Sequence, residues 1–252
     1  MVYINLTEAS WELEYNGADP LIQPAWAEER NEKMLTYHEI RKNPEVLEYY
    51  KKGNEILGSL GYTDHSTAHA AIVAEGAARI LKEFTDSEHD IELVKIAGFL
   101  HDIGNALNRE HHAEYGALLA NEILRGEDLP MEDRVKIIAA IANHDESTGN
   151  AFDPISAALI IADKTDVRRS RVRTKDPSGF DIHDRVNYAV TGSNLRYNRE
   201  KGRIELNLQV DETICTMYDY FDIFLQRMIM CRHAAETLGT TFRLSVNGQK
   251  AL

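Results

Sequence analysis

Five successive helical patterns between residues 66 and 165 constrain the fold of this chain more than any other feature. In most of them apolar residues recur every three or four positions, which gives a helix one apolar face. The segments are residues 66–82, 90–103, 112–125, 130–143 and 154–165. Ile72 and Val135 lie on two of these apolar faces and are expected to be buried, and the almost wholly apolar fifth segment is expected in the interior. The succession predicts a helical bundle.

A different pattern begins after about residue 180. Apolar and polar residues alternate near residues 195–197, 204–208 and 242–246, and this period of two predicts three strands. Residues 200–202 (Glu-Lys-Gly) predict the turn of an antiparallel hairpin. A long helix is expected over residues 212–238, with an apolar stripe that serves the core or, in part, a homodimer contact. The fold class is therefore expected to be mainly α, with a small C-terminal α+β segment.

Length and patterning together predict three parts. The chain has 252 residues, of which 43% are hydrophobic, so a sizeable core can form. We expect an irregular and helical N-terminal extension over residues 1–60 and a helical domain over residues 61–180. The α+β segment, residues 181–252, is expected to pack on that domain.

Composition excludes several classes of partner. The net charge of −13 disfavours extended nucleic acid, because an acidic surface repels a polyanion. No apolar run approaches the ~20 residues that span a bilayer, and the N-terminus lacks a secretory signal, which indicates a cytoplasmic protein without membrane contact. The two cysteines, Cys215 and Cys231, are too few for a disulfide framework and are expected to be reduced core residues.

Histidines and aspartates occur where apolar helices are expected to meet. His69 lies on the apolar face of its helix, and His101 and Asp102 follow an apolar helix directly. Asp163 lies within an apolar run, and a buried carboxylate must be paired or bind a metal ion. His112 begins the third helix and His144 ends the fourth. Nitrogen and oxygen ligands without a thiolate predict one or two divalent ions; Fe and Mn are favoured, and Zn, Ni, Co and Mg stay open.

These residues resemble a known signature. His69…His101-Asp102…Asp163 is similar to the H…HD…D pattern of the HD superfamily, and residues 99–104 (FLHDIG) resemble its HDIG box. Residues 112–117 (HAEYGA) and His144 resemble the additional histidine ligands of the binuclear subgroup. The resemblance covers roughly residues 62–170 and implies an HD-domain helical bundle with metal-dependent phosphohydrolase activity.

The resemblance also implies roles for individual residues. The metal ligands would be His69, His101, Asp102, His112, His144 and Asp163, with Asp102 bridging two ions and Asp102 and His101 essential for catalysis. His65, four residues before His69 on the expected helix face, and Asp145 are further candidates, either as ligands or as residues that orient them. Asn105 replaces the lysine of the cyclic-di-GMP phosphodiesterases, so that substrate is not carried over. The remaining histidines are expected at the surface: His38, His89, His111, His183 and His233.

A basic run follows Asp163 directly. Residues 164–175 (KTDVRRSRVRTK) contain six basic residues and one acidic residue in an otherwise acidic chain. Arginine side chains suit phosphate oxygens, so the candidate substrate-binding residues are Lys164, Arg168, Arg169 and Arg171. The alternative is a solvated basic loop or a salt-bridged dimer contact.

The expected function is metal-dependent hydrolysis of a phosphoester or phosphoanhydride bond in a small phosphorylated metabolite or nucleotide. Two alternatives remain open at this point. Some HD-superfamily proteins with six such ligands are di-iron oxygenases, and the ligand types are the same for both reactions. A non-catalytic, ligand-sensing HD module is the other alternative.

Overall fold

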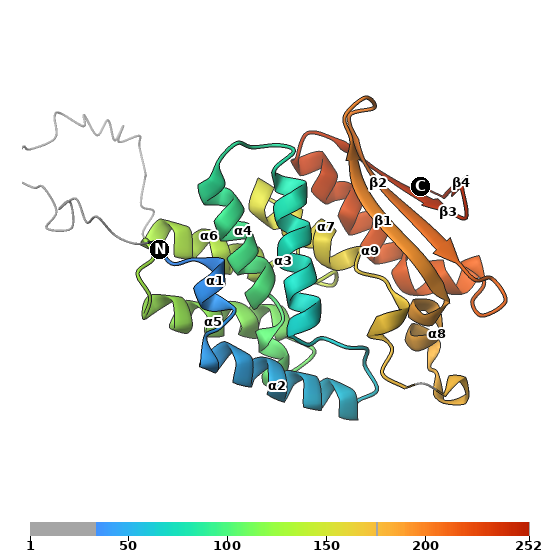
Figure 1. Ribbon diagram of the computed structural model, residues 1–252, viewed down its shortest axis with the longest axis horizontal. Coiled ribbons are helices and arrows are strands. Elements are labelled where there is room, and N and C mark those ends of the chain that lie inside the picture. The colour runs from blue at the N-terminus through green and yellow to red at the C-terminus, as the bar shows by residue number, and fades with distance from the viewer. Residues whose placement is uncertain (1–33, 175, 252) are drawn as a thin grey trace, which may run out of the picture. The chain divides into compact units, whose positions relative to one another are not determined.

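The computed structural model describes residues 34–174 and 176–251, which belong to one compact unit, Met34–Leu252 (Figure 1). The interpretation of residues 1–33 as irregular and helical lies outside the described residues. The elements are α1 (Tyr37–Ile40), α2 (Pro44–Ser59), α3 (Thr67–Leu81), α4 (Glu88–Leu100), the 3₁₀ helix η1 (Ile103–Ala106), α5 (His112–Arg125), α6 (Met131–Ala142) and α7 (Pro154–Lys164). They continue with the 3₁₀ helices η2 (Arg169–Arg171) and η3 (Pro177–Gly179), then α8 (Ile182–Ala189), β1 (Val190–Asn198), β2 (Arg203–Val210), α9 (Met217–Thr237), β3 (Thr241–Val246) and β4 (Gln249–Lys250).

Local capping sets the starts of the bundle helices. The Ser66 hydroxyl accepts from the amide of Ala68 at the start of α3, and the Ser87 hydroxyl accepts from the amide of Asp90 in α4. At α7, the Asp153 carboxylate and the Ser156 hydroxyl form a reciprocal capping box. The five predicted helices are confirmed, and the second ends at Leu100 because the chain turns at His101 and Asp102.

The core of the bundle surrounds α7, which packs against α3, α4, α6 and α9. Residues 157–161 of α7 are fully buried, as the apolar pattern predicted. The N-terminal helices close one side of this core, because Tyr37 and Tyr50 contact the ring of Phe99 and the Tyr50 hydroxyl donates to the Phe99 carbonyl at 2.7 Å. Helix α2 therefore packs directly on the bundle, and the predicted boundary at residue 60 stays a prediction.

Two expected core residues are exposed. Ile72 on α3 is 42% exposed and Val135 on α6 is 47% exposed, so placing them in the core was wrong. The buried residues of α3 include Ala70, Val73 and Ala77, and those of α6 include Ile137 and Ala140, so Ile72 and Val135 lie on the other sides of their helices. Ile72 instead lines a surface cavity beside β1.

The C-terminal segment forms a four-stranded sheet in the order β1-β2-β3-β4, associated with α9 (Figure 1). The predicted hairpin is confirmed, with Tyr197 opposite Ile204 in an antiparallel pair. Strand β3 lies parallel to β2, so α9 is the crossover between them. The predicted class, mainly α with a small α+β segment, is confirmed.

Three details of this segment differ from the sequence pattern. Helix α9 begins at Met217, because Thr216 and Asp219 form a capping box that excludes residues 212–216. The pattern did not indicate α8. Tyr218 and Leu225 are exposed, whereas Phe224 and Met228 are buried in the core, and the expected homodimer contact stays a prediction. Within the described residues, no helix is long and apolar enough to cross a membrane.

Candidate metal centre

The four bundle helices α3, α4, α6 and α7, with the start of α5, bring together side chains that are far apart in the sequence. His69 lies in the first turn of α3, and Asp163 lies in the last turn of α7. His101 and Asp102 follow α4 directly, His112 begins α5, and His144 follows α6. The four histidines and Asp102 are buried, and Asp163 is nearly so. All six predicted ligands therefore share one buried cluster.

One half of the cluster contains two histidines and two carboxylates. The Nε2 atom of His69 lies 3.3 Å from Asp163 Oδ1 and 3.6 Å from Asp102 Oδ2. The Nε2 atom of His101 lies 3.2 Å from Asp102 Oδ2 and 3.6 Å from Asp163 Oδ1. Four donor atoms at these separations are spaced as ligands of one ion are, since a ligand bond of about 2 Å on each side separates ligands by 3–4 Å.

The other half uses the second oxygen of Asp102. Asp102 Oδ1 lies 3.7 Å from His112 Nε2, and His112 Nε2 lies 3.2 Å from His144 Nε2. Asp145 Oδ2 is 3.7 Å from His112 Nε2, which places this carboxylate at the edge of the same half. Because its two oxygens face different sets of donors, the Asp102 carboxylate has the position of a bridging ligand.

The Nδ1 atoms of the four histidines all contact oxygen acceptors. His69 Nδ1 donates to Asp166 Oδ2 at 2.7 Å, and the other three donate to the backbone carbonyls of Gly98, Arg109 and Ile141 at 2.6–3.0 Å. A proton held on Nδ1 leaves the Nε2 lone pair free for a metal ion. Backbone carbonyls thus orient three of the imidazoles, and the Asp166 carboxylate orients that of His69, with Nε2 toward the cluster centre.

The cluster leaves buried polar atoms without partners, which tests whether the residues fit a metal. Within the described residues, His69 Nε2, His101 Nε2 and Asp102 Oδ2 are buried and accept or donate no hydrogen bond. Such atoms cost free energy unless something binds them. Burial opposes the charged form of His101, yet the adjacent carboxylates of Asp102 and Asp163 raise its pKa to about 10. A nitrogen and oxygen donor set with this concentration of negative charge fits one or two divalent ions.

Four cationic side chains line the small cavity beside these donors: Arg109, Lys164, Arg171 and Arg227. Lys164 Nζ lies 2.8 Å from Asp163 Oδ2 and 2.7 Å from Glu146 Oε2. Burial disfavours the charged amine, but these two carboxylates raise the pKa of Lys164 above its ordinary value, so it stays charged. The cavity therefore has donor atoms for metal ions on one wall and fixed positive charge on another.

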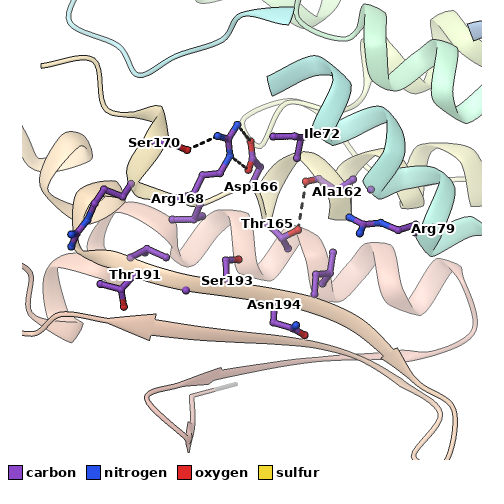
Figure 2. Close-up of a pocket in the computed structure, with 16 residues that line it drawn as sticks. Ile72, Arg79, Ala162, Thr165, Asp166, Arg168, Ser170, Thr191, Ser193 and Asn194 are labelled. Carbon is purple, nitrogen blue, oxygen red and sulfur yellow. Dashed lines mark hydrogen bonds and ion pairs between the residues drawn. The ribbon is translucent and has the colours of Figure 1, made fainter. Parts of the chain in front are cut away.

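The basic run is divided between two places. Lys164 and Arg171 line the cavity at the metal cluster. Arg168 and Arg169 line a different cavity beside β1, where Arg168 donates to Asp166 Oδ1 at 2.7 Å (Figure 2). The predicted role of the run in binding substrate at the metal centre thus has geometric support for Lys164 and Arg171, and not for the other two residues.

The two additional candidates, His65 and Asp145, also lie at the cluster. His65 precedes α3 and is not on its helical face, because Ser66 caps the helix. Its ring centroid is nevertheless 5.6 Å from that of His69, and His65 lines the cavity. Burial and the nearby Arg171 hold the pKa of His65 well below its ordinary value. Of the five histidines expected at the surface, His89 is half-buried against Asp133, and the other four are exposed.

Sequence reasoning missed four residues of the site: Asp166, Glu146, Arg109 and Arg227. Asp166 follows Asp163 by three residues, a spacing that places both on one side of a helical turn, and this signal was readable. Glu146 accepts from Arg227 Nε at 3.0 Å and also pairs with Lys164. Arg227 comes from α9, and nothing in the sequence connects that helix with the metal ligands.

A helical bundle with a buried His/Asp cluster beside four cationic side chains is the arrangement of a metal-binding site. Residues 65–168 match the model of the HD domain family, so the chain carries an HD domain. It is also 32% identical over 178 residues to an uncharacterized protein of Methanocaldococcus jannaschii. That alignment covers 60% of this chain and 66% of the relative. HD domains are mostly those of metal-dependent phosphohydrolases, and hydrolase-type chemistry at a metal site is the general activity that the family indicates.

Asp166→Asn is expected to weaken Mn²⁺ binding by about 10–100-fold. The carboxylate that accepts from His69 Nδ1 makes the imidazole a better ligand, and an amide oxygen at that position carries no charge. The measurement is a titration of metal-free protein with Mn²⁺ by calorimetry. Asp222→Asn, an exposed change on α9, is the matched control. Equal Mn²⁺ affinity in the Asp166 variant and wild type would contradict a role for Asp166 in orienting His69.

Proposed function

We propose that this protein hydrolyses a phosphoester or phosphoanhydride bond of a small phosphorylated metabolite or nucleotide at the His/Asp cluster. The observation that carries the proposal is the wall of four cations beside the cluster. Arg109 follows η1, Lys164 ends α7, Arg171 ends η2 and Arg227 belongs to α9, so four separate parts of the fold converge on one cavity. A phosphate group is the ligand that such a wall, facing metal-binding donors, suits best.

Divalent ions held by the six ligands would activate a water molecule and withdraw charge from a phosphoryl oxygen. The chain itself would supply orientation and charge. Arg171 is held by the carbonyls of Asp64 and Asp166, which accept from its Nε and Nη1 at 3.1 Å. Arg227 is held by Glu146 and lies 4.8 Å over the ring of Phe224. Guanidinium groups fixed in this way bind phosphate oxygens without first losing conformational freedom.

Lys164 has a different role in this proposal. Its amine contacts the metal-site carboxylate Asp163 and therefore stabilises that carboxylate in its charged form. Burial opposes the charged form of Asp163, but Lys164 and the two adjacent histidines hold its pKa well below the ordinary value. Lys164 thus keeps a ligand deprotonated, as a metal ligand must be.

The proposal is tested by measuring phosphate and nucleotide release from a panel of phosphorylated metabolites, with protein loaded with Mn²⁺ or Fe²⁺. Release that requires the metal supports hydrolysis. Consumption of O₂ without phosphate release would favour the oxygenase chemistry instead. Folded, metal-loaded protein that turns over no compound in either assay would favour a sensing module.

Arg227→Ala is expected to lower kcat/KM by about 10–100-fold, because a hydrogen bond to a charged group contributes about 1.5–3 kcal/mol. Metal content should stay at the wild-type value, since Arg227 is not among the ligands. Arg232→Ala removes an exposed arginine from the same helix and is the control. Wild-type kinetics in the Arg227 variant would show that α9 does not contribute to the substrate site.

A further inference from the structure

A second cavity lies between α3, the segment after α7 and β1, with a volume of ≈ 540 Å³ (Figure 2). We call it the α3–β1 cavity; its polar lining includes Arg79, Arg168, Arg169, Ser170, Thr191 and Ser193. It shares no lining residue with the cavity at the metal cluster. Volumes of about 300–1,000 Å³ are usual for sites that bind small molecules.

Three arginines from two parts of the fold line the α3–β1 cavity. Arg79 of α3 forms no hydrogen bond or ion pair with any of the residues in 34–174 and 176–251. Arg169 uses Nε to donate to the Tyr188 carbonyl at 2.6 Å and lies 4.3 Å over the Tyr188 ring. Its two terminal nitrogens have no partner in the described chain. These two side chains therefore offer unused donors, and Arg169 is already oriented.

Arg168 lines the α3–β1 cavity and is already paired within the protein. Its Nε donates to Asp166 Oδ1 at 2.7 Å, and its Nη1 donates to the Ser170 hydroxyl at 2.6 Å (Figure 2). Asp166 is the acidic residue of the cavity lining, and it already accepts from His69 and Arg168. Its charge is consequently neutralised within the protein. The α3–β1 cavity keeps an excess of positive charge, although the chain as a whole carries −13.

The rest of the lining is part polar and part apolar. The hydroxyl of Ser193 in β1 has no hydrogen-bonded partner among the described residues, and Ser193 lies below Thr165 in Figure 2. A β-bulge between Val190 and Gly192 interrupts the ladder with β2 at this position, and bulges commonly occur beside functional sites. Ile72, which is 42% exposed, contributes an apolar side chain to the opposite wall.

We infer that the α3–β1 cavity binds a small phosphorylated molecule, at a site separate from the metal centre. Arg79 and Arg169 would bind its phosphate oxygens, because planar guanidinium groups with free N–H donors match that geometry. The apolar side chain of Ile72 would contact the uncharged part of the ligand. The free hydroxyl of Ser193 offers one further hydrogen bond.

The test is calorimetric titration of the full-length, metal-free chain with pyrophosphate, AMP and uncharged adenosine. Saturable binding of pyrophosphate or AMP, but not of adenosine, is the expected result. The double variant Arg79→Ala/Arg169→Ala should weaken that binding by at least about 10-fold. Both residues are exposed, so circular dichroism and thermal unfolding should show an intact fold.

Two further variants separate the α3–β1 cavity from other sites. Arg125→Ala removes an exposed arginine on α5 and should leave binding unchanged. Arg227→Ala removes a cation from the metal-site cavity and can affect only binding there, so the binding that the double variant loses should persist in it. Absence of saturable binding at millimolar probe, or binding lost in the Arg227 variant and kept in the double variant, would overturn the inference. Failure of the proposed hydrolysis is detected independently, because that assay requires metal-loaded protein.

Discussion

Asp102→Asn is expected to abolish metal binding and to lower turnover by about 10³-fold or more, because metal ions contribute several kcal/mol of transition-state stabilisation. The amide of Asn105 donates to Asp102 Oδ1 at 2.8 Å, so the carbonyl oxygen of the new asparagine would occupy that position. Its NH₂ group would then replace Oδ2, beside the Nε2 atom of His101. A hydrogen-bond donor would then occupy the position where a metal ion needs an oxygen ligand.

The same exchange should leave the metal-free fold intact, since the new NH₂ group can donate to a histidine Nε2 atom. The distinguishing measurement is therefore thermal unfolding with and without Mn²⁺. Ligand at about 100 times Kd stabilises a folded protein by about 2.7 kcal/mol, and this gain should appear in wild type and vanish in the variant. Asp222→Asn should behave as wild type. A variant with wild-type metal content and turnover would show that Asp102 is not a required ligand.

Gly104→Ala is expected to destabilise the protein by at least about 3 kcal/mol, the upper range for overpacking of an interior. A Cβ atom on Gly104 would overlap the carbonyl oxygen of His112 and the amide nitrogen of Gly116. Both atoms belong to the backbone of α5, so no side-chain rotation relieves the overlap. Helix α5 would have to move away from η1 and would carry the ligand His112 with it.

Chemical denaturation of metal-free protein measures this effect without interference from metal binding. Gly58→Ala is the matched control, because a Cβ atom there meets only the flexible Arg173 side chain, at 3.5 Å. That substitution lies within α2 and should be neutral or stabilising by up to about 1 kcal/mol. Equal stability of the Gly104 variant and wild type would mean that α5 and η1 pack less closely than described.

The sequence predicted the bundle and the cluster because both depend on local patterns. A helical period of apolar residues identifies which side faces inward, and it therefore also identifies His69 and Asp163 as polar residues on buried faces. His101 and Asp102 were found for the same reason, since an apolar helix leads directly into them. The members of the buried cluster were thus predictable from burial and charge, with the family resemblance adding His112 and His144.

The remaining features depend on contacts between distant parts of the chain. The parallel pairing of β2 and β3 requires α9 to cross the sheet, and a period of two in each strand does not record which neighbour it will have. The basic run seemed to form one site, yet the turn through η2 sends Arg168 and Arg171 to different cavities. In an irregular segment, the spacing of residues does not predict which way each side chain points.

Through Arg227, the C-terminal segment contributes to the cavity at the metal cluster. The predicted ligands and Asp166, which accepts from His69, all lie within residues 65–168, whereas α9 lies outside that range and contributes Arg227 to the same cavity. Under the proposed function, exchange of α9 for another helix would change the cation that meets the substrate while every metal ligand is retained. Substrate preference would then change without any change in the metal ligands, because the two depend on separate stretches of the sequence.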